Sequence, residues 1–230
     1  MTGRTLALTF ETRNGKTQQD VTVTQCVVAG WTGRDKEALE KHIKELEELG
    51  VKRPASTPIF YRVSAQRLTT ADAIEVLGNT SSGEAEYVLL QHGGKLWVGV
   101  GSDHTDREVE TYGITVSKQM CDKPLAPVFW PVEEVAPHWD SLVLRSYIVE
   151  NGERKLYQEG KLAGMLSPDD LIKDYTSGQG LPDGTMMLCG TFAAIGGIRT
   201  ASRFDYEISD ATLNRTISSG YDTVSLPILG

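Results

Sequence analysis

Two consecutive glycines, Gly93 and Gly94, constrain the fold of this chain more than any other feature of its sequence. They separate the runs "EYVLLQH" and "KLWVGVGSD", which are rich in the aliphatic, aromatic and β-branched residues that strands prefer. A Gly-Gly pair between two such runs predicts a β-hairpin with a two-residue turn. In that register His92 pairs with Lys95, and each further pair steps outward by one residue on both strands.

This register brings three acidic side chains together at the open end of the hairpin. Glu84 lies directly opposite Asp103, and Glu86 is the diagonal neighbour of Asp103. Directly opposed residues and alternate residues along a strand share a face, so the three carboxylates point the same way, within roughly 5–8 Å of one another. Gly99 and Gly101 fall on the same face, where their lack of side chains is expected to leave room for a ligand.

Carboxylates this close raise one another's pKa unless a cation lies among them. A bound divalent ion is the simplest resolution, and all-oxygen donors with no nearby Cys or His pair favour Mg²⁺, Mn²⁺ or Ca²⁺ over zinc. The sequence therefore predicts a metal site at Glu84, Glu86 and Asp103. The alternative is a solvated sheet face on which Glu84 and Glu86 pair with Lys or Arg from another strand.

The β pattern extends along most of the chain. Two segments have helical periodicity instead, one from Thr32 and Asp35 to a stop at Gly50, the other from Ser167 to Gly178. The remaining runs with strand character are "LALTFET", "DVTVTQCVVAGW", "PIFYRVS", "AIEVLG", "YGITVSK", "SLVLRSYIV", "GTMMLCGTF" and "RFDYEIS". We expect a mainly β or α+β fold, with a small N-terminal αβ unit over residues 1–78 and a β-rich domain over residues 79–230.

Composition restricts the classes of function. The formal net charge of −8 and the pI of about 5.1 argue against a duplex nucleic-acid partner, which requires a basic patch. No polybasic membrane anchor is present, and no apolar run approaches the roughly 18 residues of a membrane span. Three widely spaced cysteines favour reduced thiols over disulfides or a zinc site. With an N-terminus unlike a signal peptide, these features predict a soluble, cytoplasmic protein.

The order of motifs resembles the fumarylacetoacetate hydrolase superfamily over roughly residues 80–225. "GEAEYVLL" resembles its Glu-x-Glu strand, "VGVGSDHTDRE" its "GYTVxNDVSARD" segment and "VSKQMCDKPLAPVFW" its "GKSFDTFCPLGPW" segment. The stretch from "ENGERKLYQEG" to "GTMMLCGT" resembles the later motifs. More narrowly, "GSDHTDRE" and "SKQ" resemble the DUF2848 type of bacterial protein. The resemblance implies the mixed β-sandwich roll of the superfamily's catalytic domain.

The same resemblance implies roles for two cationic residues. Lys118 falls at the family's active-site lysine, where a fixed positive charge near the metal would stabilise an enolate or oxyanion. Its alternative is a surface lysine at a strand end. Arg107 falls at the family's arginine and would hold a substrate carboxylate bidentately, against the alternative of a salt bridge to Asp106 or Glu108.

Four further residues complete the candidate site. By resemblance, Gln158 falls in the Gln-x-Gly step, and Gly190 and Thr191 fall where the family uses a threonine to hold a substrate carboxylate. Thr191 also lies in the small-residue loop "CGTFAAIGG", which suits an anionic ligand. His104 is the best histidine for a general base, although strand alternation directs it to the opposite face from Asp103 and favours a structural role.

The resemblance implies a metal-dependent enzyme that acts on a small 2-oxo or β-diketo acid and cleaves or rearranges a C–C bond. Residues 58–76, taken as the counterpart of the segment that supplies a His and a Glu in the hydrolases, contain no histidine. Decarboxylation, isomerisation or a different base is therefore expected beside hydrolysis. The alternative function is a non-catalytic sensor of small acids on the same scaffold. By analogy with β-rich proteins of this size, we expect a homodimer.

Overall fold

The glycine turn forms as the sequence predicts. The computed structural model describes residues 2–48 and 53–229, and in it Gly93 and Gly94 have φ values of 61° and 73°, the left-handed conformation that such a turn requires. They join β8 (Ala85–His92) to β9 (Lys95–Ser102). His92 pairs with Lys95 along this hairpin, so the predicted register is confirmed.

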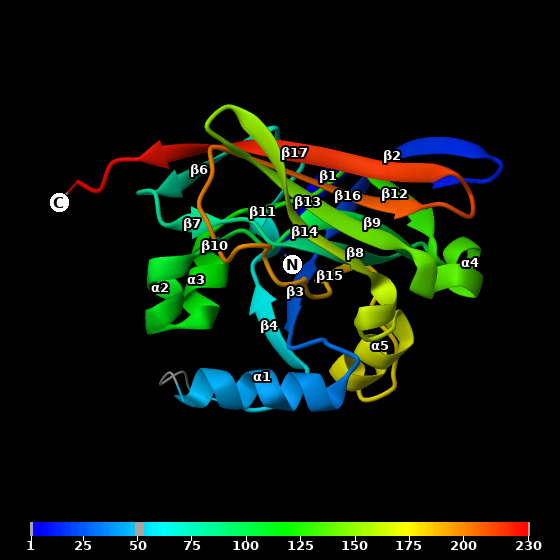
Figure 1. Ribbon diagram of the computed structural model, residues 1–230. Coiled ribbons are helices and arrows are strands. Elements are labelled where there is room, and N and C mark those ends of the chain that lie inside the picture. Colours follow the sequence, from blue (N-terminus) through cyan, green and yellow to red (C-terminus); the bar gives the residue numbers. More distant parts are fainter. Residues whose placement is uncertain (1, 49–52, 230) are drawn as a thin grey trace.

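Two sheets make up most of the molecule (Figure 1). The eight-stranded sheet has the spatial order β2 (Gly15–Val23), β1 (Arg4–Thr12), β12 (Val128–Pro131), β9, β8, β15 (Thr185–Leu188), β3 (Gln25–Gly30) and β4 (Ile59–Val63). The five-stranded sheet has the order β14 (Glu153–Lys161), β13 (Val143–Glu150), β16 (Arg203–Asp210), β17 (Arg215–Leu226) and β6 (Ala73–Leu77). Two short pairs join β7 (Ser81–Ser82) to β10 (Thr105–Asp106), and β5 (Leu68–Thr69) to β11 (Lys123–Pro124).

Both faces of β8 are buried, and this explains its nearly continuous apolar sequence. Tyr87 and Leu89 point into a core shared with the five-stranded sheet, whereas Val88 and Leu90 point into a second core enclosed by the curl of the eight-stranded sheet. Glu86 alternates with Tyr87 along this strand, so its carboxylate is only 2% exposed. A strand buried on both sides thus holds an acidic side chain in the interior.

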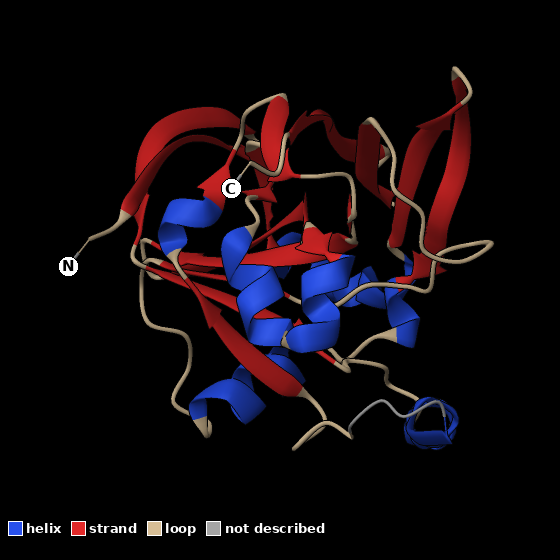
Figure 2. Cartoon of the chain, turned by 90° about the vertical axis from the view of Figure 1, so that its left-hand side faces the viewer, coloured by secondary structure: helices blue, strands red, loops and turns tan. Residues whose placement is uncertain are grey.

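In the described part of the chain five helices connect the strands, and Figure 2 shows the helices mostly in the lower half of the view. They are α1 (Lys36–Glu48), α2 (Arg107–Tyr112), α3 (Ile114–Met120), α4 (Val132–Val135) and α5 (Pro168–Thr176). Short 3₁₀ turns lie at Ala65–Arg67, Ala136–Ser141 and Leu162–Gly164. None of the described helices combines the length and the apolar character needed to cross a membrane.

Both predicted helices are present. Asp35 caps α1 by accepting hydrogen bonds from the N–H groups of Glu37 and Ala38, and Ser167 caps α5. The predicted stop at Gly50 lies outside the described residues. The mainly β architecture is confirmed, and strands from residues 1–78 share the eight-stranded sheet with β8, β9, β12 and β15.

The prediction of a strand at "YGITVSK" is wrong, because this segment forms the end of α2 and nearly all of α3. Its β-branched residues favour a strand, but local capping and tertiary contacts favour a helix. Asp106 caps α2 through the N–H groups of Glu108 and Val109, and Ser117 Oγ donates to the Asp106 carbonyl from within α3. The two short helices place Arg107 and Lys118 beside the hairpin.

Candidate active site

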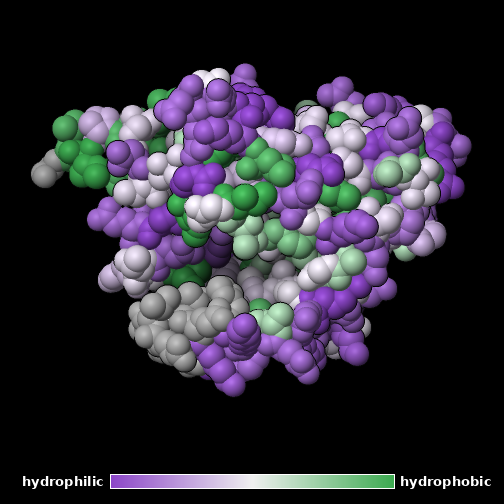
Figure 3. All heavy atoms as spheres, in the orientation of Figure 1, coloured by the Kyte–Doolittle hydropathy of each residue, from purple (hydrophilic) through white to green (hydrophobic). Residues whose placement is uncertain are grey.

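A cavity of about 810 Å³ opens beside the hairpin, where the ends of several elements meet. Its wall includes residues from β3, the start of α1, α2, α3 and the loop that follows β15. Figure 3 shows a hollow on this face, between the sheets and the part of the chain around α1. The site residues are therefore brought together from segments far apart in the sequence.

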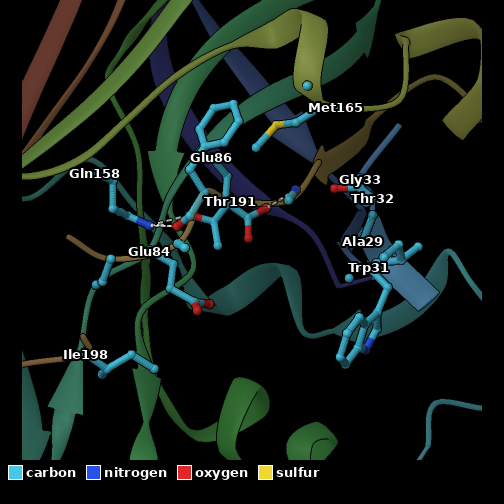
Figure 4. A pocket seen from close by; sticks show the side chains of 18 of the residues that line it. Ala29, Trp31, Thr32, Gly33, Glu84, Glu86, Gln158, Met165, Thr191 and Ile198 are labelled. Carbon is cyan, nitrogen blue, oxygen red and sulfur yellow. Dashed lines mark hydrogen bonds between the residues drawn. The ribbon is translucent and has the colours of Figure 1, made fainter. Parts of the chain in front are cut away.

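The three predicted carboxylates meet at one end of this cavity. Glu84, Glu86 and Asp103 each offer one oxygen, and these oxygens lie within 4.8 Å of one another. Asp103 N–H donates to the Glu84 carbonyl at 2.9 Å, which extends the hairpin register by one pair. Figure 4 shows Glu84, Glu86 and Thr191 on the same side of the cavity, with Glu86 beside Thr191. The geometry predicted from the turn is present.

Burial separates the proton affinities of two of these carboxylates. Burial raises the pKa of Glu86 well above its ordinary value, and the nearby charge of Asp103 raises it further. Burial would also raise the pKa of Asp103, but Lys118 and Lys123 oppose it and hold this pKa at about 2. At neutral pH the cluster therefore combines a permanently ionised Asp103 with a Glu86 that lacks a cation of its own.

Lys118 is a buried partner of the cluster and not a surface lysine. Its Nζ contacts Asp103 Oδ2 and lies 3.8 Å from Glu84 Oε2 and 5.8 Å from the centre of the Tyr61 ring. Burial opposes its charge, but Asp103 and Glu84 raise the pKa of the ammonium above its ordinary value. Lys118 thus stays positively charged at the edge of the cavity.

Lys123 is a site residue that the sequence prediction missed. It is fully buried, and its Nζ lies 3.1 Å from Asp103 Oδ1 and donates to the His104 carbonyl at 2.6 Å. Both oxygens of Asp103 therefore face a lysine. The available signal was a lysine placed before Pro124 in the otherwise apolar run "KPLAPVFW", where a surface position is unexpected.

Arg107 begins α2 and reaches back to the cluster. Its Nε donates to Ser82 Oγ at 2.7 Å, and its Nη1 contacts Glu110 at 3.0 Å. Nη2 lies 3.3 Å from Glu84 Oε1 but is buried without a hydrogen bond among the described residues. The ion pairs therefore involve Glu84 and Glu110 and not the expected alternatives Asp106 and Glu108.

Gln158 lines the cavity, but all of its amide's hydrogen-bonding capacity is used within the protein. Its Oε1 accepts from Ala85 N at 3.0 Å and Ser146 Oγ at 2.7 Å. Its Nε2 donates to Thr191 Oγ1 at 2.7 Å and to the Phe192 carbonyl at 2.6 Å. Gln158 ties β8, β13 and the loop after β15 together.

Thr191 and Gly190 are likewise directed at β8. The Thr191 hydroxyl donates to the Ala85 carbonyl at 2.7 Å, and Gly190 N–H donates to Glu86 Oε2 at 2.7 Å. Gly190 has φ 99°, and a Cβ atom there would lie 1.8 Å from Thr32 Oγ1. Glycine is therefore required where this loop supports the buried Glu86.

His104 is not brought to the cavity. It is 1% exposed, its Nδ1 lies 2.8 Å from the Tyr221 hydroxyl, and burial followed by the charge of Lys123 lowers its pKa to about 3. The described side chains that line the cavity include no histidine. Strand alternation had indicated this opposite orientation.

The expectation that Gly99 and Gly101 leave room for a ligand is wrong. A Cβ atom at Gly99 would lie 2.8 Å from the Phe129 ring, and one at Gly101 would lie 2.9 Å from the Pro124 carbonyl. Protein atoms fill both spaces. The glycines serve close packing of the curled sheet, and the cavity lies farther along the hairpin.

The donor set fits a hard divalent cation. It consists of carboxylate oxygens, with no described cysteine or histidine among the cluster. Glu86 accepts a hydrogen bond from Gly190, and burial together with the charge of Asp103 raises its pKa despite the nearby charge of Lys118. A cation at this cluster would supply the charge that Glu86 lacks. Lys118 and Lys123 contact Asp103, and Lys118 also lies 3.8 Å from Glu84 Oε2.

Comparisons with known proteins give the family and the fold. A model of the family described as "Protein of unknown function (DUF2848)" matches residues 29–221. No curated protein matches the sequence. A solved structure of 2-keto-3-deoxyarabinonate dehydratase has a TM-score of 0.65 and 17% identity, covering 89% of this chain and 75% of that one.

Two other solved structures have the same fold. The dehydratase of 2-keto-3-deoxy-D-arabinonate, complexed with magnesium and 2,5-dioxopentanoate, has a TM-score of 0.63 and 16% identity, covering 93% of this chain and 78% of that one. A yeast protein of the fumarylacetoacetate hydrolase family has a TM-score of 0.61 and 17% identity, covering 88% and 94%. The predicted roll architecture is confirmed.

Proposed function

Since the chain belongs to the DUF2848 family and has the fold of fumarylacetoacetate hydrolase family proteins, we propose that it is a divalent-metal-dependent enzyme. Its substrate is a small 2-oxo or β-diketo acid, and it cleaves or rearranges the C–C bond next to the carbonyl. The observation that carries this proposal is the convergence of three carboxylate oxygens within 4.8 Å, beside the buried cation of Lys118, at a cavity large enough for such an acid.

Glu84, Glu86 and Asp103 would hold Mg²⁺, or Mn²⁺ or Ca²⁺ in its place. When bound, the ion supplies Lewis-acid polarisation of the substrate's carbonyl. The proposal is supported by a protein of the same fold whose structure is described as a complex with magnesium and a dioxo acid. Lys118 and Lys123 hold the pKa of Asp103 at about 2, so Asp103 would remain an anionic ligand throughout the physiological range.

The chain's own cations supply the remaining chemistry. Lys118 Nζ stays protonated beside the cluster and stabilises negative charge on the oxygen of an enolate, a role that requires a fixed charge in a dry site. Arg107 Nη2, a buried donor 3.3 Å from Glu84 Oε1 and without a hydrogen bond among the described residues, would bind the substrate carboxylate. Gln158, Gly190 and Thr191 position β8 and its Glu86 through the loop after β15.

One observation favours a non-catalytic alternative. His104, the histidine that the sequence favours as base, is buried away from the cavity with its pKa lowered to about 3. A chain without a working base would bind the small acid as a sensor and not turn it over. Binding and turnover must therefore be measured separately.

Metal binding by Glu86→Gln tests the proposal. The substitution keeps the size of the side chain and its acceptor for Gly190 N–H but removes the charge. The exposed Glu75→Gln on β6 is the matched control. Mn²⁺ binding, followed by the spin resonance of the free ion, should be lost in Glu86→Gln and retained in Glu75→Gln. Unchanged binding in Glu86→Gln would defeat the metal site.

Turnover of acylpyruvates and oxaloacetate with Mg²⁺ then separates the two functions. Product formation that depends on both Mg²⁺ and Lys118 supports the enzyme. Saturable binding without turnover of any 2-oxo acid supports the sensor. We further propose that the protein acts in the cytoplasm and that it forms a homodimer. Light scattering on the purified chain would test the homodimer by its mass in solution.

A further inference from the structure

The cavity wall is divided by chemistry into two ends. Its cationic and most of its anionic side chains lie at one end, around β8, α2 and α3. The other end comes from residues 29–39, residues 164–165 and the loop after β15. Apart from Asp35, this second wall is apolar or small, and its larger members are Trp31, Leu39, Met165, Phe192 and Ile198. Figure 4 shows Trp31 across the cavity from Glu84 and Glu86.

The space at the apolar end exceeds what the chelating part of a substrate needs. A volume of about 810 Å³ lies within the range of roughly 300–1,000 Å³ found for pockets that enclose drug-sized ligands. An oxalate or pyruvate ion bound at the carboxylates would leave most of the cavity unfilled. The substrate is therefore expected to extend from the charged end into the apolar end.

Polar groups near the apolar end already form hydrogen bonds within the protein. Asp35 accepts the first N–H groups of α1, and the Tyr157 hydroxyl accepts from Arg199 N at 3.0 Å. Gln158 makes four internal hydrogen bonds. A hydroxylated sugar chain entering here would lose hydrogen bonds to water without equivalent replacements, which opposes its binding.

The residues of the apolar wall are held in place by close packing and by specific backbone conformations. Phe192 packs against Gly160 so closely that a Cβ atom at Gly160 would lie 2.5 Å from the ring. Trp31 has a left-handed backbone with φ 58°, a conformation that is costly for a residue with a side chain and that often accompanies function. Ile198, at the cavity, is 58% exposed and would gain from contact with an apolar ligand.

We propose that the substrate is a 2-oxo acid whose far end is a large apolar group, aromatic or branched aliphatic, and that the apolar wall selects it over hydroxylated sugar acids. This inference rests on the proposed function, because the charged end must hold the 2-oxo acid. The apolar group would lie between Trp31, Phe192 and Ile198.

Calorimetric binding to the full chain with Mg²⁺ tests this selection. The probes are oxalate, 2-oxobutanoate, 2-oxo-4-phenylbutanoate and 2-keto-D-gluconate, which share the chelating end and differ in the tail. Burial of a phenyl group should make 2-oxo-4-phenylbutanoate bind roughly 10- to 100-fold more tightly than 2-oxobutanoate. The hydroxylated acid should bind no more tightly than 2-oxobutanoate.

Two substitutions in one loop provide the matched comparison. Ile198→Ser should weaken binding of the phenyl acid roughly three- to tenfold and leave oxalate binding unchanged. Ile195 is 51% exposed in the same loop but does not line the cavity, so Ile195→Ser should change neither. Both isoleucines are exposed, so neither substitution should prevent folding. A difference in binding between the two variants therefore reports on the cavity.

The outcomes separate the inference from the function beneath it. Oxalate binding together with equal affinity for the phenyl and hydroxylated acids overturns the apolar selection and leaves the proposed function standing. Equal effects of Ile198→Ser and Ile195→Ser on the phenyl acid also overturn it. If neither oxalate nor any 2-oxo acid binds in the presence of Mg²⁺, the proposed function and this inference fail together.

Discussion

Replacement of Gln158 by leucine separates two roles for this residue. The sequence places Gln158 among the substrate-binding residues, whereas the structure uses its whole amide to join Ala85, Ser146, Thr191 and Phe192. Leucine has a similar volume, so Gln158→Leu removes four hydrogen bonds without opening a large cavity. A positioning role predicts a loss of stability, and a substrate contact predicts a loss of affinity.

The expected loss of stability follows from the groups that lose their hydrogen-bond partner in Gln158→Leu. A buried donor or acceptor that loses its partner costs about 1–3 kcal/mol. The Ser146 and Thr191 hydroxyls can rotate toward other acceptors, but Ala85 N–H and the Phe192 carbonyl are fixed in the backbone. The two fixed groups predict a loss of about 2–6 kcal/mol in the free energy of unfolding. Since whole domains are stable by about 5–15 kcal/mol, the loss is large.

Urea unfolding followed by tryptophan fluorescence measures this difference. Gln18→Leu, at an exposed position of β2, is the control and should stay within about 0.5 kcal/mol of the unsubstituted chain. Binding of 2-oxo-4-phenylbutanoate to folded Gln158→Leu completes the comparison. A variant with unchanged midpoint and slope in urea, but with affinity for the acid reduced a hundredfold, would refute the positioning role and restore Gln158 as a substrate ligand.

Three further predictions address the charged end. Because the folded pKa of Glu86 is raised, its proton stabilises the metal-free protein fully below the unfolded pKa of about 4.3, and the free energy of unfolding should fall as pH rises through the raised pKa. Urea titrations should show this fall, about 1.4 kcal/mol per pH unit at most, in the unsubstituted chain but not in Glu86→Gln, and added Mg²⁺ should suppress it. Lys123→Met leaves Asp103 Oδ1 without its cation, so urea unfolding should show a loss of about 3–5 kcal/mol, and a loss below 1 kcal/mol would contradict the buried pair. His104→Gln should keep kcat within about threefold in steady-state assays, because His104 is buried and does not line the cavity; a fall in kcat of about 10²-fold or more would return the role of base to His104.

The part of the site that depends on local geometry could be predicted from the sequence. Gly93 and Gly94 fix a register over a few residues, and that register brings Glu84, Glu86 and Asp103 together without knowledge of the rest of the fold. The roles of Gly99 and Gly101 could not be predicted this way. Phe129 and Pro124 fill the spaces they leave, and nothing local indicates which distant segment packs against a strand.

Tertiary packing also explains the other misplacements. Residues 114–116 are β-branched at every position, yet Asp106 and Ser117 stabilise the helical form through contacts outside that run. The structure also lines the cavity with Ala38 and Leu39 of α1, which the sequence pattern does not indicate. Which helix faces a cavity is decided by the whole fold.

The position of β15 between β8 and β3 has a consequence for synthesis of the protein. Thr24 N–H bonds to the Gly184 carbonyl at the start of the parallel pairing, across a separation of 160 residues. At about 5–20 residues per second, β3 would wait roughly 8–30 seconds on the ribosome before its partner strand is made. Until then β8 and β3 each have an unpaired edge, and the loop that supports Glu86 does not yet exist. The newly made chain therefore depends on its last quarter both to protect its sheet from association with other chains and to complete its acidic centre.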